Sequence, residues 1–145
     1  MDSCTTLFLV SCVSKKAEYP SRARDLYESD LFRKARAYVE QFNQPWFILS
    51  AEYGLVNPDA IIAPYDRTLN TMGFKERRAW ADGVSAALVK LMPDLPNVTF
   101  LAGQRYREFL TDDLQQRGVK VNVPMEGLRI GEQLSWLRKH TLNPD

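Results

Sequence analysis

Hydroxyl, thiol and ammonium groups are concentrated in one short segment near the N-terminus. It reads Ser-Cys-Val-Ser-Lys-Lys over residues 11–16 and directly follows an apolar run. Small hydroxyl residues beside lysines can bind an anion through their side chains and through exposed backbone N–H groups. We therefore expect Cys12 and Ser14 to bind substrate and Lys15 to take part in catalysis. A surface loop with solvated lysines is the alternative, and a cysteine in this position is more often a small core residue.

Aromatic and charged side chains are combined in the stretch between residues 50 and 69. The candidates for a binding or catalytic site in this stretch are Glu52, Tyr53, Gly54, Tyr65, Asp66 and Arg67. A connection of this length in a compact domain is commonly a binding or active-site element. The tyrosines offer flat faces for stacking, the glycine can adopt a positive φ, and the charged groups can read the polar edge of a base. Alternatively, the tyrosines anchor the loop and Asp66 caps a turn.

Two further segments contain glycine and follow apolar runs. Gly103 allows a ligand to approach the backbone, and the helix expected after it favours negative charge at its start, close to Tyr106. Glu126 lies at the end of the last apolar run, ahead of Gly127 and Gly131. Both segments also fit ordinary strand-to-helix connections. We treat Gly103, Tyr106 and Glu126 as candidate substrate-binding residues.

Apolar runs and helical patterns alternate along the chain. The pattern predicts strands at residues 6–11, 46–50, 98–102 and 120–123, and helices at about 29–42, 74–92, 106–117 and 131–141. Such alternation indicates right-handed βαβ crossovers. We therefore predict one α/β domain over residues 1–145, built as a three-layer α/β/α sandwich around a four-stranded parallel sheet. Ligands bind such sheets beyond the carboxyl ends of the strands, where all four segments described above would lie.

The composition restricts the classes of function. The chain has 145 residues, of which 45% are hydrophobic and 26% charged, as expected for one globular domain. Its formal net charge of +1 means that a nucleic-acid binder would need a local basic face. The two cysteines and single histidine match neither metal-ligand spacing nor a disulfide framework, so we expect no metal and no cofactor. With no apolar run long enough to span a bilayer and no signal peptide, we expect a cytoplasmic protein.

The motifs taken together resemble a small bacterial and phage family of unknown function. The resemblance is carried by residues 11–16, 23–27, 47–56, 64–66 and 127–134, and so extends over nearly the whole chain. More distantly, the Cys-Ser-Lys signature is similar to that of the archaeosine synthase core domain. The overall layout is similar to that of the peroxide-stress protein YaaA and of the uracil-DNA glycosylase superfamily. This resemblance implies a four-stranded parallel sheet between helices and chemistry on a nucleobase.

The expected activity follows from this resemblance together with the residues above. The superfamily's water-activating Asp motif and histidine-bearing loop were not found in the chain, which favours a modified base over uracil. We expect a DNA glycosylase-like hydrolase that extrudes a modified base, for example in phage DNA, for anti-phage defence or DNA modification. Tyr53 and Tyr65 would sandwich the base, Asp66 or Glu52 would stabilise the charge on the sugar, and Lys15 is an alternative nucleophile. A non-catalytic nucleic-acid or nucleotide-binding module and an enzyme acting on free nucleosides or nucleotides are the other hypotheses.

Overall fold

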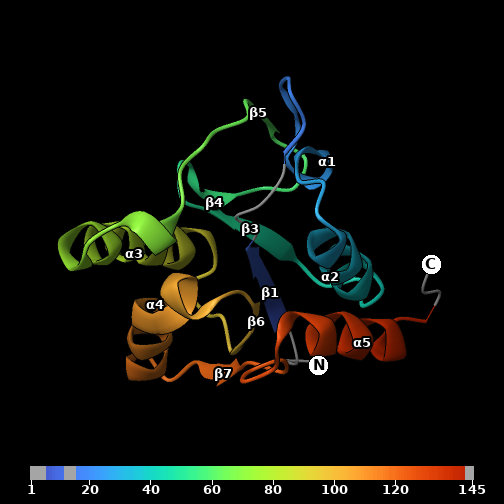
Figure 1. The fold of residues 1–145 in the computed structure, drawn as a ribbon. Coiled ribbons are helices and arrows are strands. Elements are labelled where there is room, and N and C mark those ends of the chain that lie inside the picture. The colour runs from blue at the N-terminus through green and yellow to red at the C-terminus, as the bar shows by residue number, and fades with distance from the viewer. Residues whose placement is uncertain (1–5, 12–15, 143–145) are drawn as a thin grey trace.

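A mixed, mostly parallel sheet of five strands forms the centre of the molecule (Figure 1). The computed structural model describes residues 6–11 and 16–142. The strands lie in the order β4 (Gly54–Val56), β3 (Trp46–Ser50), β1 (Thr6–Ser11), β6 (Asn97–Leu101) and β7 (Lys120–Asn122). All neighbouring pairs are parallel except β3 and β4. Because β1 is central, its four middle residues are all buried, which explains its continuous apolar run.

Helices cover both faces of this sheet (Figure 1). On one face lie α3 (Phe74–Leu91) and α4 (Gln104–Gln116), and on the other lie α2 (Asp30–Glu40) and α5 (Ile130–His140). Successive residues of β1 point to opposite faces, so that Leu7 and Leu9 join one apolar core while Phe8 and Val10 join the other. No helix in the described part of the chain has both the length and the apolar character needed to cross a membrane.

The elements predicted from periodicity agree closely with the structure. Two strands have the predicted bounds, β6 begins and ends one residue earlier than predicted, β7 ends one residue earlier, and all four predicted helices are present. Ser29 caps α2, with its Oγ accepting the backbone N–H of Phe32 at 3.2 Å. The predicted number of strands is wrong, because β4 adds a fifth, antiparallel strand at the edge of β3.

A tight turn produces this fifth strand. The buried Ser50 Oγ accepts the backbone N–H groups of Glu52 and Tyr53 at 3.2 and 2.9 Å. Gly54 then adopts a φ of 76°, a conformation that glycine reaches without steric cost. Trp80 of α3 donates its indole N–H to the Ser50 carbonyl at 2.8 Å. The Ser-Ala-Glu-Tyr-Gly motif therefore forms a hairpin, and the positive φ expected at Gly54 is confirmed.

A small second unit lies beyond the β4 edge of the sheet, next to α2 (Figure 1). It consists of the helix α1 (Ala23–Leu26) and a two-stranded antiparallel ribbon of β2 (Ser21–Arg22) and β5 (Ile61–Ile62). We call residues 21–26 and 57–62 the ribbon unit. Backbone hydrogen bonds from Ala23 to Ala60 and from Arg24 to Pro58 join its two halves at 2.8 and 2.9 Å. A short 3₁₀ helix, η1 (Leu69–Thr71), follows before α3 begins.

Candidate functional site

A cavity of about 620 Å³ lies at the carboxyl edge of the parallel strands. It is lined by residues at or just beyond the ends of β1, β6 and β7 and by the first residues of α2, α4 and α5. These segments meet because each parallel strand ends, and the helix after it begins, at the same edge of the sheet. The lining residues used below are Ser11, Gly103, Tyr106, Arg107, Glu126 and Gln133. The cavity thus lies at the edge of the sheet at which we expected a ligand to bind from the sequence.

The lining of the cavity combines apolar and polar residues. The apolar residues include Phe32, Ala35, Met125, Leu128 and Leu134 around α2 and α5, and Phe100 and Leu101 in β6. The polar residues include Ser11, Asn70, Gln104 and Arg107, together with Asp30 of α2 and Gln133 of α5. A ligand with a flat apolar part and a polar or charged part fits such a lining.

An arginine on α4 and a glutamate before α5 form a charged pair on the wall of this cavity. Arg107 Nη1 lies 3.7 Å from Glu126 Oε2. The Arg107 side chain is only 17% exposed, and its Nε donates to the carbonyl of Ala102 at 3.3 Å. The Glu126 side chain, by contrast, is 67% exposed. The guanidinium is therefore held in place by its surroundings, whereas the carboxylate lies largely in solvent.

Tyr106 connects the cavity to the segment that contains Asp66. Its side chain is buried, and its ring packs edge-to-face on Trp80 at 5.6 Å between ring centroids. Its hydroxyl lies 3.4 Å from both the Leu69 backbone N–H and the Thr68 hydroxyl. Tyr106 therefore lines the cavity and also positions the chain that follows Asp66 and Arg67.

The two tyrosines expected to sandwich a base contact each other instead. The rings of Tyr53 and Tyr65 lie 5.5 Å apart with an angle of 88° between their planes. The Tyr65 hydroxyl is 2.6 Å from that of the buried Tyr27, and Lys16 Nζ lies 4.3 Å from the Tyr65 ring centroid. This edge-to-face arrangement has no parallel slot between Tyr53 and Tyr65, so the expected sandwich is not formed. The four residues form a separate cluster that does not line the cavity.

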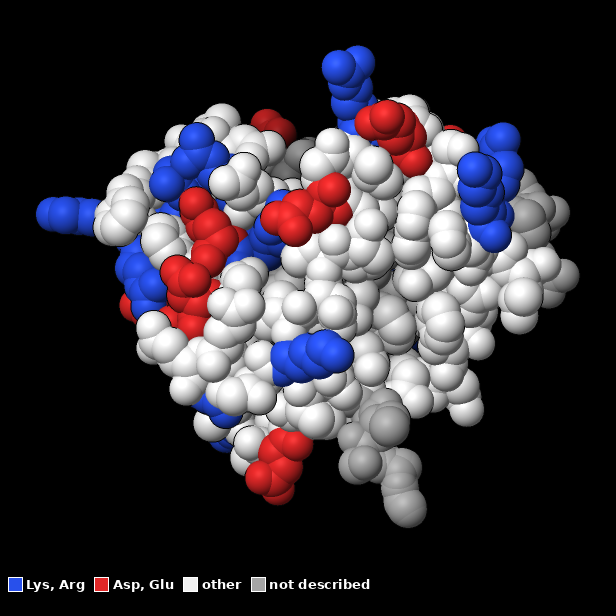
Figure 2. Space-filling view, turned by 90° about the horizontal axis from the view of Figure 1, so that it is seen from below, with Lys and Arg blue, Asp and Glu red and all other residues white. Residues whose placement is uncertain are grey.

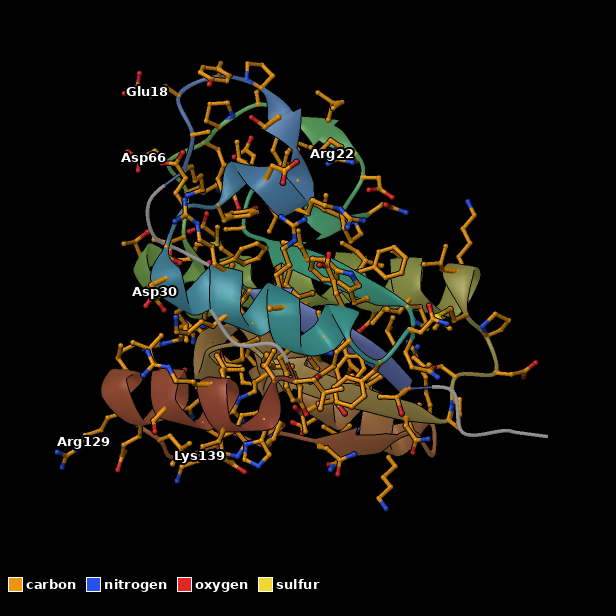
Figure 3. All side chains as sticks on the ribbon, turned by 90° about the vertical axis from the view of Figure 1, so that its right-hand side faces the viewer. Glu18, Arg22, Asp30, Asp66, Arg129 and Lys139 are labelled. Atoms are coloured by element: carbon orange, nitrogen blue, oxygen red, sulfur yellow. The ribbon has the colours of Figure 1, made fainter. Side chains whose placement is uncertain are left out.

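The charged candidates between residues 50 and 69, namely Glu52, Asp66 and Arg67, also lie outside the cavity wall. Arg67 is within 3.8 Å of both Glu52 and Glu76, and all three side chains are exposed. Asp66 is exposed and makes no hydrogen bond or ion pair with any other described residue. In Figure 3, Asp66 and Asp30 project from the side of the molecule at which α2 begins. Within the described part of the chain, Asp66 therefore has no ion-pair partner, whereas Glu52 has a counter-ion.

The candidate residues chosen from the sequence thus fall into three groups. Gly103, Tyr106 and Glu126 line the cavity, while the six candidates between residues 52 and 67 do not. Cys12, Ser14 and Lys15 lie outside the described residues. Within the described ranges, no three His, Cys, Asp or Glu side chains are grouped so as to hold a metal ion.

Several residues that line the cavity were not identified as candidates from the sequence. Ser11, which the sequence grouped only with its loop, accepts the backbone N–H of Gly103 at 3.3 Å and joins the ends of β1 and β6. Arg107 and Gln133 were not singled out. A signal existed for Arg107, since it follows the candidate Gly103 by four residues at the start of a predicted helix, and residues four apart share a helix face.

The fold and the cavity define a mixed α/β protein with a mostly parallel sheet and a ligand-sized hollow at its carboxyl edge. The chain belongs to a family of unknown function, DUF6884, whose model matches residues 7–139. It is also similar to the uncharacterized protein YfjM of Bacillus subtilis (strain 168), with 32% identity over 92 residues. That match covers 63% of this chain and 61% of the length of YfjM. The expected membership in a family of unknown function is thereby confirmed.

Proposed function

We propose that the chain binds one nucleotide of DNA in the cavity and hydrolyses the N-glycosidic bond of a modified base. The observation that carries this proposal is the cavity of about 620 Å³ at the carboxyl edge, lined by both apolar and polar residues. Its volume lies within the range of about 300–1,000 Å³ found for small-molecule sites. An extruded base would lie against the apolar lining residues, and its sugar and phosphate would face the polar ones.

The proposed reaction needs a carboxylate near the sugar. The bond between C1′ and the base nitrogen breaks, its electron pair leaves with the base, and a water oxygen bonds to C1′ while the water proton neutralises the base. Positive charge builds up on the sugar during this step, and a nearby carboxylate stabilises it or orients the water. Neither Asp66 nor Glu52 lines the cavity, so the sugar would have to lie at its border, toward the segment after Asp66 that Tyr106 contacts. Of the two, Asp66 suits this role better, because no described residue neutralises its charge, whereas Arg67 lies 3.8 Å from Glu52.

We further infer that the architecture is the three-layer α/β/α sandwich of the uracil-DNA glycosylase superfamily, with β4 as an addition at one edge. Two observations support this. The parallel strands lie in the order β3-β1-β6-β7, and a separate apolar core packs on each face of the sheet.

Base release from DNA tests the proposed activity. Purified protein is incubated with plain DNA and with hypermodified phage DNAs, and abasic sites are then measured. We expect release from at least one modified DNA. Asp66→Asn should lower the rate at least about a hundredfold, in line with loss of a catalytic carboxylate. Glu52→Gln is the matched control and should retain the rate within about threefold, since Glu52 is paired at the surface. Equal losses in both variants would argue against the role of Asp66.

A non-catalytic binding module is the second candidate. It is favoured by one observation, namely that neither Asp66 nor Glu52 lines the cavity. Retained DNA binding without base release on every DNA tested would select this alternative.

The formal net charge of +1 supports a third hypothesis, an enzyme acting on free nucleotides. On the face seen from below, acidic and basic side chains are interspersed, and the described residues of that face form no extended basic patch (Figure 2). Release of a base from nucleoside monophosphates but not from DNA would favour this hypothesis.

A further inference from the structure

The pair formed by Arg107 and Glu126 is asymmetric in a way that suggests a replaceable partner. Arg107 comes from a helix, its side chain is 17% exposed, and a backbone carbonyl fixes its Nε at 3.3 Å. Glu126 follows β7 in a connecting segment, and its side chain is 67% exposed. The carboxylate can therefore leave at little cost, because water solvates it almost as well when it is unpaired.

The guanidinium also has hydrogen-bonding capacity that Glu126 does not use. The 3.7 Å between Arg107 Nη1 and Glu126 Oε2 exceeds the length of a hydrogen bond. Apart from the bond from Nε to Ala102, the Arg107 side chain makes no hydrogen bond with the described residues. A guanidinium has five N–H donors in a planar fork that matches the oxygens of a phosphate. A phosphate on the cavity wall would therefore form the hydrogen bonds that the carboxylate does not.

We propose that Arg107 binds the phosphate of the ligand and that Glu126 occupies its place until the phosphate displaces it. Glu126 then compensates the charge of Arg107 in the empty cavity and moves into solvent when ligand binds. The cavity would consequently discriminate between ligands by their charge, binding a nucleotide or a unit of DNA in preference to an uncharged nucleoside. Because the ligand class comes from the proposed function, the experiment below measures phosphate binding separately from base release.

Nuclear magnetic resonance with small phosphates tests this proposal without knowledge of the base. The probes are inorganic phosphate, which represents the monoester of a free nucleotide, and dimethyl phosphate, which represents the diester of the DNA backbone. We expect at least one of them to cause saturable shifts of the Arg107 Nε–H resonance and of the backbone amides of Gly103 and Gly127. The probe that binds more tightly indicates which of the two sources supplies the phosphate.

Three variants and one control define the expected changes in affinity. Arg107→Gln should weaken phosphate binding at least about tenfold, because charge-assisted hydrogen bonds are lost, and Arg107→Lys should lie between it and the unmodified protein. Glu126→Gln should tighten binding about two- to fivefold, because an exposed competing charge is removed. Arg105→Gln removes an exposed positive charge from the same helix without touching the cavity wall, and should leave binding unchanged. Thermal unfolding of each variant verifies its fold.

The outcomes separate this proposal from the proposed reaction. If neither probe binds, if Glu126→Gln binds no more tightly, or if Arg105→Gln weakens binding as much as Arg107→Gln, Arg107 is not the phosphate site. Phosphate binding at Arg107 in a protein that releases no base would support Arg107 and contradict the glycosylase. Base release by a protein in which Arg107→Gln leaves the Michaelis constant unchanged would support the glycosylase and contradict Arg107 as the phosphate site.

Discussion

At the scale of single residues, Gly54 determines the reversal of the chain between β3 and β4. Its φ of 76° allows the reversal from which β4 begins. A Cβ atom at this position would lie 3.8 Å from Val84 Cγ2, which is ordinary contact. Any cost of a side chain at position 54 is therefore conformational and not steric.

The first stability prediction compares this glycine with one inside a helix. Gly54→Ala should lower the free energy of unfolding by about 1–2 kcal/mol, the cost of a left-handed conformation for a residue with a Cβ. Gly83 lies exposed within α3, and a Cβ there would meet no atom within 4 Å. Gly83→Ala should raise the free energy of unfolding by about 0.5–1 kcal/mol. Denaturant unfolding measures both, and a change of the same sign in the two variants would contradict this explanation.

At the scale of elements, ion pairs hold the ribbon unit against α2. Arg24 of α1 lies 2.8 Å from Glu40 on α2 and 2.7 Å from Asp59 on the other half of the unit. Arg36 of α2 lies 2.9 Å from Asp25 and donates to the Arg24 carbonyl at 3.0 Å. These contacts support a unit whose strands have only two residues each, too few to be stable alone.

The pKa of Asp25 gives this contact a pH dependence. Burial alone would raise the pKa and is the largest single contribution, but the hydrogen bonds and charges of Arg36 and Arg22 together outweigh it and lower the pKa below 3.8. The stabilisation from the ionised carboxylate is therefore present above pH 3.8 and is lost as the pH falls through the lowered value. The ribbon unit should loosen from α2 in acid.

Substitution of Arg36 tests this contact. Arg36→Gln should lower the free energy of unfolding by about 1 kcal/mol, since its partners are partly exposed. It should also speed amide hydrogen exchange at Ala23 and Arg24. In this variant, acidification should reduce the protection of these two amides by less than it does in the unmodified protein. Arg33→Gln is the control, because Arg33 is exposed on the same helix and its side chain contacts no charged group among the described residues. Equal exchange at Ala23 in both variants would show that the ion pairs do not hold the unit.

At the scale of the whole molecule, the sequence predicts the regular elements better than the contacts between them. The strands at residues 6–11 and 46–50 have continuous apolar patterns that determine their bounds. β4 and the ribbon unit have strands of two or three residues, which are too short to show periodicity. They depend on pairing between segments such as Ser21 and Ile62, which lie far apart in the chain.

The candidate site could be predicted only in part for the same reason. The rule for parallel sheets selects the edge at which the cavity lies, and three of the residues chosen with it, Gly103, Tyr106 and Glu126, line that cavity. It does not distinguish side chains that face the cavity from those that turn aside. Tyr53 and Tyr65 turn toward each other, and Glu52 toward Arg67. Those choices depend on tertiary packing, as does the contact between Arg107 and Glu126.

The central claim is that the hollow at the carboxyl edge is where this protein binds its ligand. The most direct measurement is a map of backbone amide shifts during titration with each of the four deoxynucleoside monophosphates and with a short single-stranded DNA. We expect the perturbed amides to cluster at Ser11, at residues 103–107 and at residues 126–130. Shifts confined to the opposite edge of the sheet, around Leu95 and Val119, or the absence of shifts with every ligand, would contradict the claim.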